Sequence, residues 1–353
     1  MKPTVHDIAA HAGVSLATVD RVLNGRAGVR GPTRERVEAA IAALGYVRDV
    51  SAANLAKGRR YSFVFILPAN DNSFMRALRH EVEEASRHLK PERITIGVIT
   101  VPAFDSAALV AALDQAGAET PDGVALVAVD TPEVAAAVGR LRDQGIAVVT
   151  LVSDLSGHQR DHFAGIDNRA AGRTAASLLG RFVGKDHVGG KEQAGETVGG
   201  RIAVIAGSLQ VVDHQERYAG FTEVMRRDFP HLTLLPVLQG RDDPAEVEKV
   251  VADLYAQGEE LAGLYSLGAG NRGLVRCLRR HARQRRPAVI AHELTETTRA
   301  ALEDGMIDAV LNQDAGHEVR SAIRVLKAKA DKAPVIAAQE RIRIDIFLKD
   351  NLP

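Results

Sequence analysis

Three side chains near the start of the chain, Leu16, Ala17 and Arg21, have residue types and a spacing that suit DNA recognition. The guanidinium of Arg21 can donate two hydrogen bonds to one guanine, a contact that discriminates against the wrong base by about 1–3 kcal/mol. Leu16 and Ala17 can touch only apolar groups such as the thymine methyl. Exposed together on one helix, the three residues would read base edges in the major groove.

Two short amphipathic helices around the turn Ala12-Gly13-Val14 would have to position these residues. Thr4 is a good N-cap for the first helix, and Asp7 in the first turn favours the helix start. Gly13 permits a sharp turn, and Ser15 can cap the second helix. This arrangement predicts a helix-turn-helix.

Apolar stripes on the second and third helices predict the core of this head. The second helix would bury Val19, Val22 and Leu23 and turn Asp20 outward with the recognition residues. A third helix is expected to begin at Pro32-Thr33, because proline suits a first helical turn, and to end at Gly45. Its buried stripe has helical spacing and consists of Val37, Ala40, Ile41 and Leu44.

The charge of the chain is unevenly distributed. Residues 1–60 hold ten Lys and Arg against five Asp and Glu, a net charge of +5. Because the whole chain is formally neutral, the remaining residues carry −5. A basic head on an acidic body attracts phosphates at one end of the chain.

Length and composition limit the class of protein. A chain of 353 residues predicts two or three compact units. The sequence has no run of eighteen apolar residues and no signal peptide at its N-terminus, and its single cysteine, Cys277, suits a reducing compartment. We therefore expect a cytoplasmic protein that does not contact a membrane.

Residues 4–60 closely resemble the DNA-binding head of the lactose and galactose repressor (LacI/GalR) family. The matching stretches are Asp7-Ile8-Ala9, Ala12-Gly13-Val14-Ser15, Thr18-Val19, Arg21-Val22-Leu23-Asn24, Arg34-Glu35-Arg36-Val37 and Gly45-Tyr46. The resemblance implies that residues 50–57 form a hinge helix on DNA and that Leu55 wedges into the minor groove at the operator centre. The DNA-contacting residues expected in the head and hinge are Thr4, Ser15, Leu16, Ala17, Thr18, Arg21, Asn24, Tyr46, Asn54 and Leu55.

Asp20 and Asn54 depart from the pattern of this family. Most relatives carry a small polar residue, usually serine, at the position of Asp20, and a basic or small residue is common at the position of Asn54. An acidic group at residue 20 would repel phosphate or select cytosine. The operator sequence is therefore left open.

From Tyr61 the pattern changes from helical to alternating strand and helix. Apolar runs typical of buried parallel strands form two sets, at 62–67, 94–101, 123–129 and 146–152, and then at 201–206, 261–267, 287–291 and 308–311. Amphipathic stretches separate them. The sequence predicts an all-α head followed by an α/β body of two Rossmann-like lobes with parallel sheets.

These patterns also set the expected domain limits. We expect a helix-turn-helix domain at 1–48, a hinge at 49–60, a two-lobed effector-binding and dimerisation domain at 61–345, and a C-terminal tail at 346–353. The polar, glycine-rich stretch 184–200 predicts a flexible surface loop between the two sets of strands.

Most of residues 61–345 resemble the periplasmic sugar-binding-protein fold that serves as the effector domain of the same repressor family. The matching pieces are Asn72-Ser73-Phe74, Gly165-Ile166-Asp167-Asn168, Ala171-Gly172, Glu216-Arg217 and Gly220-Phe221. The resemblance implies a type I periplasmic binding protein fold, in which strand ends of both lobes face a ligand-binding cleft.

Residues that follow the predicted strands are therefore candidates for ligand contact. Amides and carboxylates can hold sugar hydroxyls through paired hydrogen bonds, and Phe74 can stack on a pyranose ring. The same residue types at strand ends also cap helices. With Asp167 added by resemblance, the candidates are Asn72, Phe74, Asp130, Ser153, Asp154, Asp167, His214, Gln215, Asn271, His292, Glu293 and Gln313.

The hexapeptide Gly268-Ala269-Gly270-Asn271-Arg272-Gly273 satisfies the dinucleotide fingerprint GxGxxG, and Glu293 follows Gly273 by twenty residues. It supports an alternative function as an NAD-dependent dehydrogenase or dinucleotide sensor. The late position of the motif argues against this alternative, as does Arg272, which would occupy the turn that packs against phosphate.

Other chemical motifs are weak. His158 and His162 have a helical i, i+4 spacing but lie in a predicted loop without an evident third ligand, so no metal is predicted. Cys277 falls in a predicted helix, where it suits a small buried residue. The basic cluster at 279–286 is best read as a solvated helix face. No catalytic residue and no cofactor are predicted.

The sequence therefore predicts a ligand-responsive transcriptional repressor and not an enzyme. A homodimer would place two heads on the half-sites of a near-palindromic double-stranded operator. A sugar or polyol would close the lobes and alter the order of the hinge helix, although a nucleoside ligand stays open. A transport-type sugar-binding protein is a further alternative, against which the basic head argues. Induction or co-repression, and dimer or tetramer, are not decided.

Overall fold

The computed structural model describes residues 3–23, 25–46, 58–69, 72–157, 159–183, 200–281 and 286–353. The chain divides into two compact units, Met1–Arg59 and Arg60–Pro353, which are called the head and the body below. Several expectations lie outside the described residues: those on Asn24, Asn54, Leu55, the hinge helix 50–57, His158 and nearly all of the loop 184–200.

The head contains the three expected helices, α1 (Val5–Ala12), α2 (Leu16–Leu23) and α3 (Gly31–Leu44). Thr4 and Asp7 form a capping box at the start of α1, in which the Thr4 backbone N–H donates to Asp7 Oδ2 at 2.7 Å. Gly13 closes α1 with a φ of 62°, a backbone conformation that glycine adopts without a steric cost. The backbone N–H of Thr18 donates to Ser15 Oγ at 3.3 Å, so the predicted cap of α2 is confirmed.

The core of the head forms around Ile8, Val19 and Val37, which are fully buried. The predicted outward residues of α2, namely Leu16, Ala17, Asp20 and Arg21, are all exposed. Two details differ from expectation. Helix α3 begins at Gly31 and not at Pro32. Four residues expected in the core are half-buried because they lie at the edge of a core built from three short helices, namely Val22, Leu23, Ile41 and Leu44.

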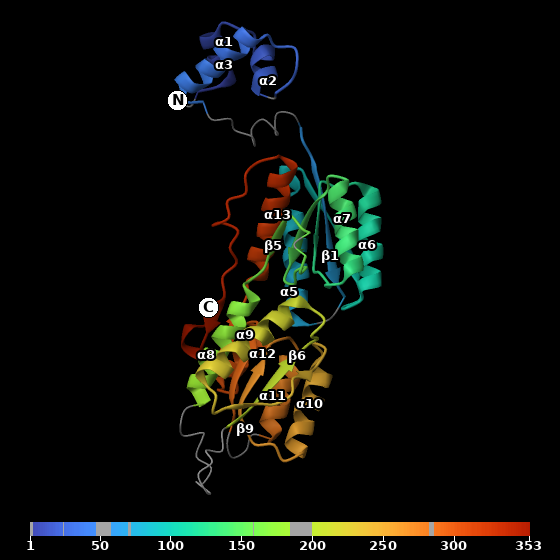
Figure 1. The fold of residues 1–353 in the computed structure, drawn as a ribbon, viewed down its shortest axis with the longest axis vertical. Helices are drawn as coiled ribbons and strands as arrows, with labels where there is room; N and C mark the ends of the chain where they lie inside the picture. The colour runs from blue at the N-terminus through green and yellow to red at the C-terminus, as the bar shows by residue number, and fades with distance from the viewer. Residues whose placement is uncertain are drawn as a thin grey trace. The chain divides into compact units, whose positions relative to one another are not determined.

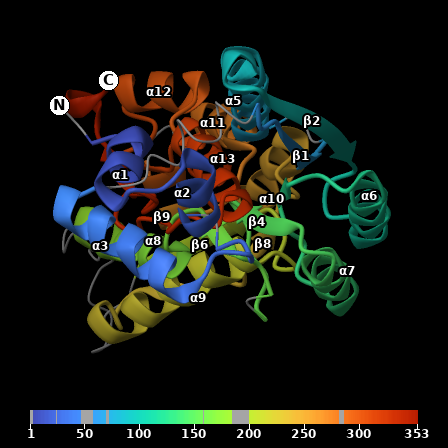
Figure 2. The same ribbon diagram turned by 90° about the horizontal axis from the view of Figure 1, so that it is seen from above.

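The first lobe of the body, the N-lobe, is a parallel sheet of order β2-β1-β3-β4-β5. Its strands are β1 (Tyr61–Pro68), β2 (Ile94–Val101), β3 (Gly123–Leu126), β4 (Ala147–Leu151) and β5 (His162–Ala164). Alternate residues of β1 face opposite layers. Phe63 and Phe65 pack in the cluster that includes α5 (Ser73–His88) and α13 (Ala315–Ala330), while Val64 and Ile66 pack against α6 (Ser106–Glu119) and α7 (Pro132–Asp143). Figure 2 shows α6 and α7 side by side on that face.

The second lobe, the C-lobe, has a sheet of order β12-β11-β10-β9-β6-β7, with β8 pairing β6. Figure 1 labels β6 and β9 of this sheet. Its strands are β6 (Arg201–Ala206), β7 (Thr233–Leu234), β8 (Leu238–Gln239), β9 (Leu261–Ser266), β10 (Ala288–His292), β11 (Ala309–Asn312) and β12 (Asp345–Phe347). Its helices are α8 (Asn168–Val183), α9 (Val212–Asp228), α10 (Pro244–Ala256), α11 (Asn271–His281) and α12 (Glu296–Glu303). Short 3-10 helices, η1 (Lys90–Glu92) and η3 (Lys349–Asn351), lie outside the sheets. The predicted architecture of two α/β lobes is confirmed.

Three expectations about the body are wrong in detail. The segment 346–353 is not a detached tail, because Ile346 and Phe347 pair antiparallel with β11. His162 lies in the edge strand β5 and not in a loop, since its backbone pairs with Val149 of β4. The strands β5, β7, β8 and β12 are two or three residues long and were not predicted. Such short edge strands form through pairing with a neighbour and carry little local signal.

The chain passes between the lobes at several points. It leaves the N-lobe between β5 and α8, returns between β11 and α13, and crosses again after α13 to reach β12. Ile166 of the first crossing and Ile342 of the last are buried together against Ala171. At the far end of α13 the Tyr61 hydroxyl donates to the carboxylate of Asp331 at 2.9 Å, which fixes the start of β1.

Helices α8 and α9 pack backbone against backbone at two glycines. A Cβ atom on Gly172 would lie 1.9 Å from the carbonyl oxygen of Arg217, and one on Gly220 would lie 2.1 Å from that of Arg169. Neither contact can be relieved by turning a side chain, since the obstacle is main chain. The two helices therefore require glycine at both positions.

We predict that Gly172→Ala lowers the free energy of unfolding by about 1–3 kcal/mol, the range for overpacking a tight interior. Urea denaturation followed by circular dichroism measures the change. Gly139→Ala in α7 is the matched control, because its Cβ would meet only Gln159 Oε1 at 3.5 Å. That variant should be neutral or up to about 1 kcal/mol more stable, since alanine favours helix. Equal stability of both variants would contradict the predicted close packing.

Candidate functional site

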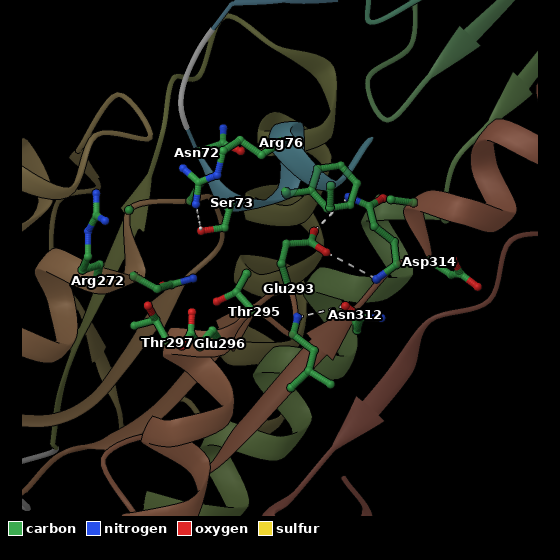
Figure 3. A pocket seen from close by; sticks show the side chains of 18 of the residues that line it. Asn72, Ser73, Arg76, Arg272, Glu293, Thr295, Glu296, Thr297, Asn312 and Asp314 are labelled. Atoms are coloured by element: carbon green, nitrogen blue, oxygen red, sulfur yellow. Dashed lines mark hydrogen bonds between the residues drawn. The ribbon is translucent and has the colours of Figure 1, made fainter. Parts of the chain in front are cut away.

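A polar cavity of about 460 Å³ lies where the carboxyl ends of C-lobe strands meet the start of α5 in the N-lobe. Figure 3 shows Asn72, Ser73 and Arg76 on one side and Thr295, Glu296 and Arg272 on the other, with Glu293 between them. Its walls offer amides, hydroxyls and carboxylates from both lobes. Of the expected ligand contacts, those that line it are Asn72, Phe74, Asn271, Glu293 and Gln313.

A second, smaller cavity of about 60 Å³ lies at the strand ends of the N-lobe. Val101, Val127 and Ser153 line it from that lobe, and Asp213 and His214 line it from α9. The hydroxyl oxygen of Ser153 and the Oδ1 atom of Asp213 are buried and have no hydrogen-bond partner among the described residues. This cavity therefore brings together the expected contacts Ser153 and His214.

The buried guanidinium of Arg217 organises the C-lobe side of the cleft. Only 2% of the residue is exposed. Its Nε donates to Asn168 Oδ1 at 2.8 Å and its Nη1 donates to the carbonyl oxygen of Leu267 at 2.8 Å. Its Nη2 lies 3.9 Å from Glu293 Oε1 and makes no hydrogen bond within the described part of the chain. One buried donor is thus left without a hydrogen-bond partner among the described residues.

Glu293 follows β10 with a φ of 68°, a left-handed conformation that non-glycine residues rarely adopt. Its Oε1 accepts a hydrogen bond from Gln313 Nε2 at 2.9 Å. Burial raises the pKa of Glu293 to about 7, against the opposing effects of the Arg217 charge and the Gln313 hydrogen bonds. The carboxyl group therefore changes protonation near neutral pH, and strained backbone of this kind is concentrated at functional sites.

Three further expected contacts have structural partners inside the C-lobe. Asn271 accepts from Ser266 Oγ at 2.8 Å and donates to the carbonyl oxygen of His292 at 3.0 Å. The Nδ1 atom of His214 accepts from the backbone N–H of Ser208 at 3.1 Å. His292 is fully buried, and its Nε2 lies 2.8 Å from the Tyr265 hydroxyl. The residue lines neither cavity.

Four more expected ligand contacts, in addition to His292, lie outside both cavities and form hydrogen bonds with nearby residues. Asp130 accepts from the backbone N–H of Ser156 at 3.1 Å, and Asp154 accepts from Thr150 Oγ1 at 2.6 Å and from Arg160 Nε at 3.0 Å. Asp167 caps α8 by accepting from the N–H of Ala170 at 2.8 Å. Gln215 donates to the carbonyl oxygen of Leu209 at 2.7 Å. These residues shape loops and helix starts.

Sequence reasoning missed several residues that the structure places at the cleft. Asp213 and Asp242 line the smaller cavity, and Thr295 and Asn312 line the larger one. Arg217 was quoted only as part of a matching motif. A charged residue within the otherwise apolar face of a helix was the available signal, because buried arginines are rare unless they have a partner.

The glycines of the hexapeptide 268–273 are explained by packing. A Cβ on Gly273 would lie 1.7 Å from the carbonyl oxygen of Pro244, where α11 meets α10, and one on Gly268 would lie 2.5 Å from Asp242 Oδ1. Gly270 has a φ of 90°, which favours glycine. The motif therefore serves the contact between α10 and α11 and the loop before α11.

The weaker motifs also have structural explanations. Cys277 is buried, and burial raises the pKa of its thiol to about 11. Arg280 pairs with Glu248, and Arg286 donates to Asp308 at 2.6 Å. No three His, Cys, Asp or Glu side chains converge on a common point in the described ranges. None of the described helices has the length and apolar character that crossing a membrane requires.

The candidate DNA-binding surface of the head is the exposed face of α2. Leu16 is 43% exposed, although it is a large apolar residue, and Ala17 and Arg21 are exposed beside it. Ser15 is exposed, while Thr18 and Tyr46 are half-buried. Thr4 is exposed but already bonded to Asp7. An exposed leucine at the start of a helix and an exposed arginine in its last turn can contact a thymine methyl group and a guanine edge.

These features define a class of protein: a helix-turn-helix head attached to a two-lobed body with a polar cleft. Residues 63–334 match the periplasmic binding protein domain family, and residues 4–49 match the bacterial regulatory proteins of the lacI family. The chain belongs to the periplasmic binding protein domain family through its body and carries a lacI-family head. The two resemblances inferred from the sequence are confirmed.

Relatives of the head are transcriptional regulators. The chain is 36% identical over 90 residues to catabolite control protein A of Priestia megaterium, covering 26% of this chain and 27% of that protein. It is 42% identical over 85 residues to the HTH-type transcriptional regulator MalR of Streptomyces coelicolor, covering 24% of each. The chain thus spans about a quarter of the length of these curated relatives. Nothing among them supports the dehydrogenase alternative.

Solved structures share the fold of the body. GanP, a glucose-galactose binding protein from Geobacillus stearothermophilus, is 19% identical with a TM-score of 0.70, covering 84% of this chain and 99% of that chain. The XylFII-LytSN complex is 17% identical with a TM-score of 0.72, covering 83% and 100%. At this identity the likeness confirms the type I periplasmic binding protein fold.

We predict that Glu293→Gln reduces the pH dependence of stability. A carboxyl group whose pKa is about 7 when folded and 4.5 in a free glutamate stabilises the fold fully below pH 4.5, and this contribution is lost as the pH rises to about 7. The wild type should lose roughly 3 kcal/mol across this window through Glu293. Urea unfolding at a series of pH values measures the slope.

The slope that remains in Glu293→Gln comes from the other groups with shifted pKa values, among them Glu318 and Glu216, whose pKa burial raises, and His292, whose pKa burial lowers. The control is Glu303→Gln, a substitution on the exposed face of α12 that should keep the slope of the wild type. Superimposable pH profiles for Glu293→Gln and the wild type would show that Glu293 does not titrate in this range.

Proposed function

We propose that this chain is a sequence-specific DNA-binding transcriptional repressor whose operator affinity is controlled by a small ligand bound between the lobes of the body. The observation that carries the proposal is the exposed face of α2, where the side chains of Leu16, Ala17 and Arg21 are exposed on a lacI-family head. A head of this kind joined to a ligand-binding body suggests that ligand binding to the body controls DNA binding by the head.

In this proposal α2 enters the major groove of double-stranded DNA. Arg21 grips a guanine, and Leu16 and Ala17 contact thymine methyl groups. The further DNA contacts that we propose are Thr4, Ser15, Thr18, Asn24 and Tyr46 of the head, with Asn54 and Leu55 of the hinge. The net charge of +5 on residues 1–60 supplies the attraction to phosphate that gives such complexes most of their affinity.

The ligand that we propose is a sugar or a polyol. Support comes from polar atoms of cavity-lining residues that have no hydrogen-bond partner among the described residues, among them Ser153 Oγ, Asp213 Oδ1 and Gln313 Oε1. Buried polar atoms without partners are rare in folded proteins, so a polar ligand would explain several at once. Solved neighbours point the same way: GanP is named as a glucose-galactose binding protein, and another neighbour is described in complex with D-arabinose.

We further propose a homodimer in the cytoplasm that catalyses no reaction. A two-fold axis would present two heads to the two half-sites of a near-palindromic operator. The described titratable residues of the cleft bind one another or stay open to a ligand, and the thiol of Cys277 is buried away from the cleft. A role in binding DNA and a ligand accounts for the polar residues of the cleft without a catalytic group.

We predict that Arg21→Ala weakens binding to an operator in the DNA upstream of the gene by about 1–3 kcal/mol, as expected for the loss of one bidentate base contact. Gel-shift titrations at several salt concentrations measure the affinity and its salt dependence. Arg280→Ala on the body, where Arg280 pairs with Glu248, is the control and should bind as the wild type does. If the wild-type chain shifted no upstream DNA at low salt, with or without sugars and polyols, the proposed function would be wrong.

A further inference from the structure

The smaller cavity has an apolar wall on the side of the N-lobe. The polar side chains on this side are Asp105 and Ser153. Asp105 Oδ1 accepts from the backbone N–H of Ala108 at 2.9 Å and so caps α6. Most of the wall is formed by apolar residues at the carboxyl ends of the strands and at the start of α5, which include Met75, Val101, Val127 and Val152.

The main chain of this wall is bonded within the sheet. The carbonyl oxygen of Val101 accepts from the backbone N–H of Ala69 at 2.7 Å. The backbone N–H of Ala128 donates to the carbonyl oxygen of Ser153 at 3.3 Å. Because these groups already have partners, the N-lobe wall offers a ligand mainly apolar surface.

The opposite wall, which belongs to the C-lobe, is polar. Asp213, His214 and Asp242 line it. Asp242 Oδ1 already accepts from the backbone N–H of Ala269 at 2.8 Å. Asp213 is only 6% exposed, and its Oδ1 atom has no hydrogen-bond partner among the described residues. A ligand hydroxyl group that donates to Asp213 would supply the partner that this buried acceptor needs.

The smaller cavity adjoins the larger one. Phe74 lines the larger cavity and the next residue, Met75, lines the smaller one. Ala269 lines the larger cavity and donates to Asp242, which lines the smaller one. The volumes are about 460 and 60 Å³. Since a water molecule takes up about 30 Å³ in the liquid, the smaller cavity has room for only one end of a ligand.

A group that fits the smaller cavity must match two walls of opposite character. Water fits poorly against the apolar wall, because a buried water molecule needs two to four polar partners. A hydroxymethyl group, the usual end of a hexose, can bond to Asp213 but then leaves the apolar wall uncovered. If it turns toward that wall instead, its hydroxyl group is buried without a partner, which is unfavourable. A methyl group with a hydroxyl group nearby on the same skeleton satisfies both walls.

We propose that the ligand of the cleft is a deoxy sugar or deoxy polyol that ends in a methyl group. The methyl group packs against Val101 and Val127 in the smaller cavity. A hydroxyl group close to it on the skeleton donates to Asp213, and the other hydroxyl groups lie in the polar larger cavity. The inference rests on the proposed function, because it names the chemical class of the ligand that controls the head.

Matched pairs that differ only by a methyl or a hydroxymethyl end test the inference on the full-length chain. The pairs are D-fucose with D-galactose, 6-deoxy-D-glucose with D-glucose, L-rhamnose with L-mannose, L-fucose with L-galactose, and L-fucitol with galactitol, each at about 10 mM in a thermal-shift assay. At least one methyl compound should raise the melting temperature by about 2–4 °C, with a smaller rise for its partner. An equal or larger rise with the hydroxymethyl partner, or no rise with any methyl compound, overturns the inference.

Calorimetry then gives the ratio of the two dissociation constants for the pair that binds. The methyl compound should bind about 10- to 100-fold more tightly, because an apolar pocket discriminates against an added hydroxyl group by up to about a hundredfold. Two variants locate the methyl group. Val101→Thr and Val127→Thr keep the shape of the side chain but give the wall a hydroxyl group, so each should lower the ratio roughly fivefold.

Val98→Thr is the matched control for these variants. Val98 lies on β2, as Val101 does, but it is 43% exposed and lines neither cavity, so its ratio should equal that of the wild type. Because the ratio compares two ligands on the same protein, partial loss of folded protein does not change it. A wild-type ratio in both Val101→Thr and Val127→Thr overturns the placement of the methyl group.

Failure of the inference can be told apart from failure of the proposed function. If a sugar or polyol with a hydroxymethyl end binds as tightly as its methyl partner and changes the gel shift of operator DNA, the regulator is real and the methyl subsite is wrong. If the chain binds no DNA under any condition, the regulator proposal fails whatever the cleft binds.

Discussion

The arrangement of the C-lobe side of the cleft depends on the hydrogen bonds of one buried cation, the guanidinium of Arg217. This cation reaches Asn168 at the start of α8 and the carbonyl oxygen of Leu267 after β9 because α8 and α9 touch through Gly172 and Gly220. A buried charge is tolerated only when hydrogen bonds and opposite charge surround it. The positions of α8, α9 and the end of β9 are therefore linked to the electrostatics of the site.

Beside this single cation lie several buried acidic side chains, and not all of their oxygen atoms have a hydrogen-bond partner among the described residues. Glu293 is held in a strained backbone conformation and Glu318 is left without a hydrogen bond. Folded proteins seldom tolerate both unless function requires it. Polar atoms without hydrogen-bond partners lie in both lobes. A ligand that bonds to atoms of both lobes makes all its contacts only while the lobes are together. This is the differential affinity that a ligand needs to shift a conformational equilibrium.

Local signals explain what could be predicted from the sequence. Gly13 marks a turn by itself, and the strand Ile94–Val101 consists of β-branched residues apart from Gly97, so both were found with their limits. The rule that strand ends meet at a cleft indicated Asn271, which lines the larger cavity, but equally indicated Asp130, whose carboxylate caps a nearby loop. No residue type separates the two outcomes. Arg217 was missed because its burial results from the packing of distant helices.

Helix α13 connects the ligand cavity to the first strand of the body. Ala315 and Gly316 at its start line the larger cavity, and Asp331 just past its end holds the Tyr61 hydroxyl. Tyr61 is the second residue of the body, next to the chain that comes from the head. Sixteen helical residues span about 24 Å, and a helix packed along its length moves as a rigid strut. A rotation of the C-lobe that carries Gln313 would therefore act on one end of α13, while the other end is hydrogen-bonded to Tyr61 at the start of β1.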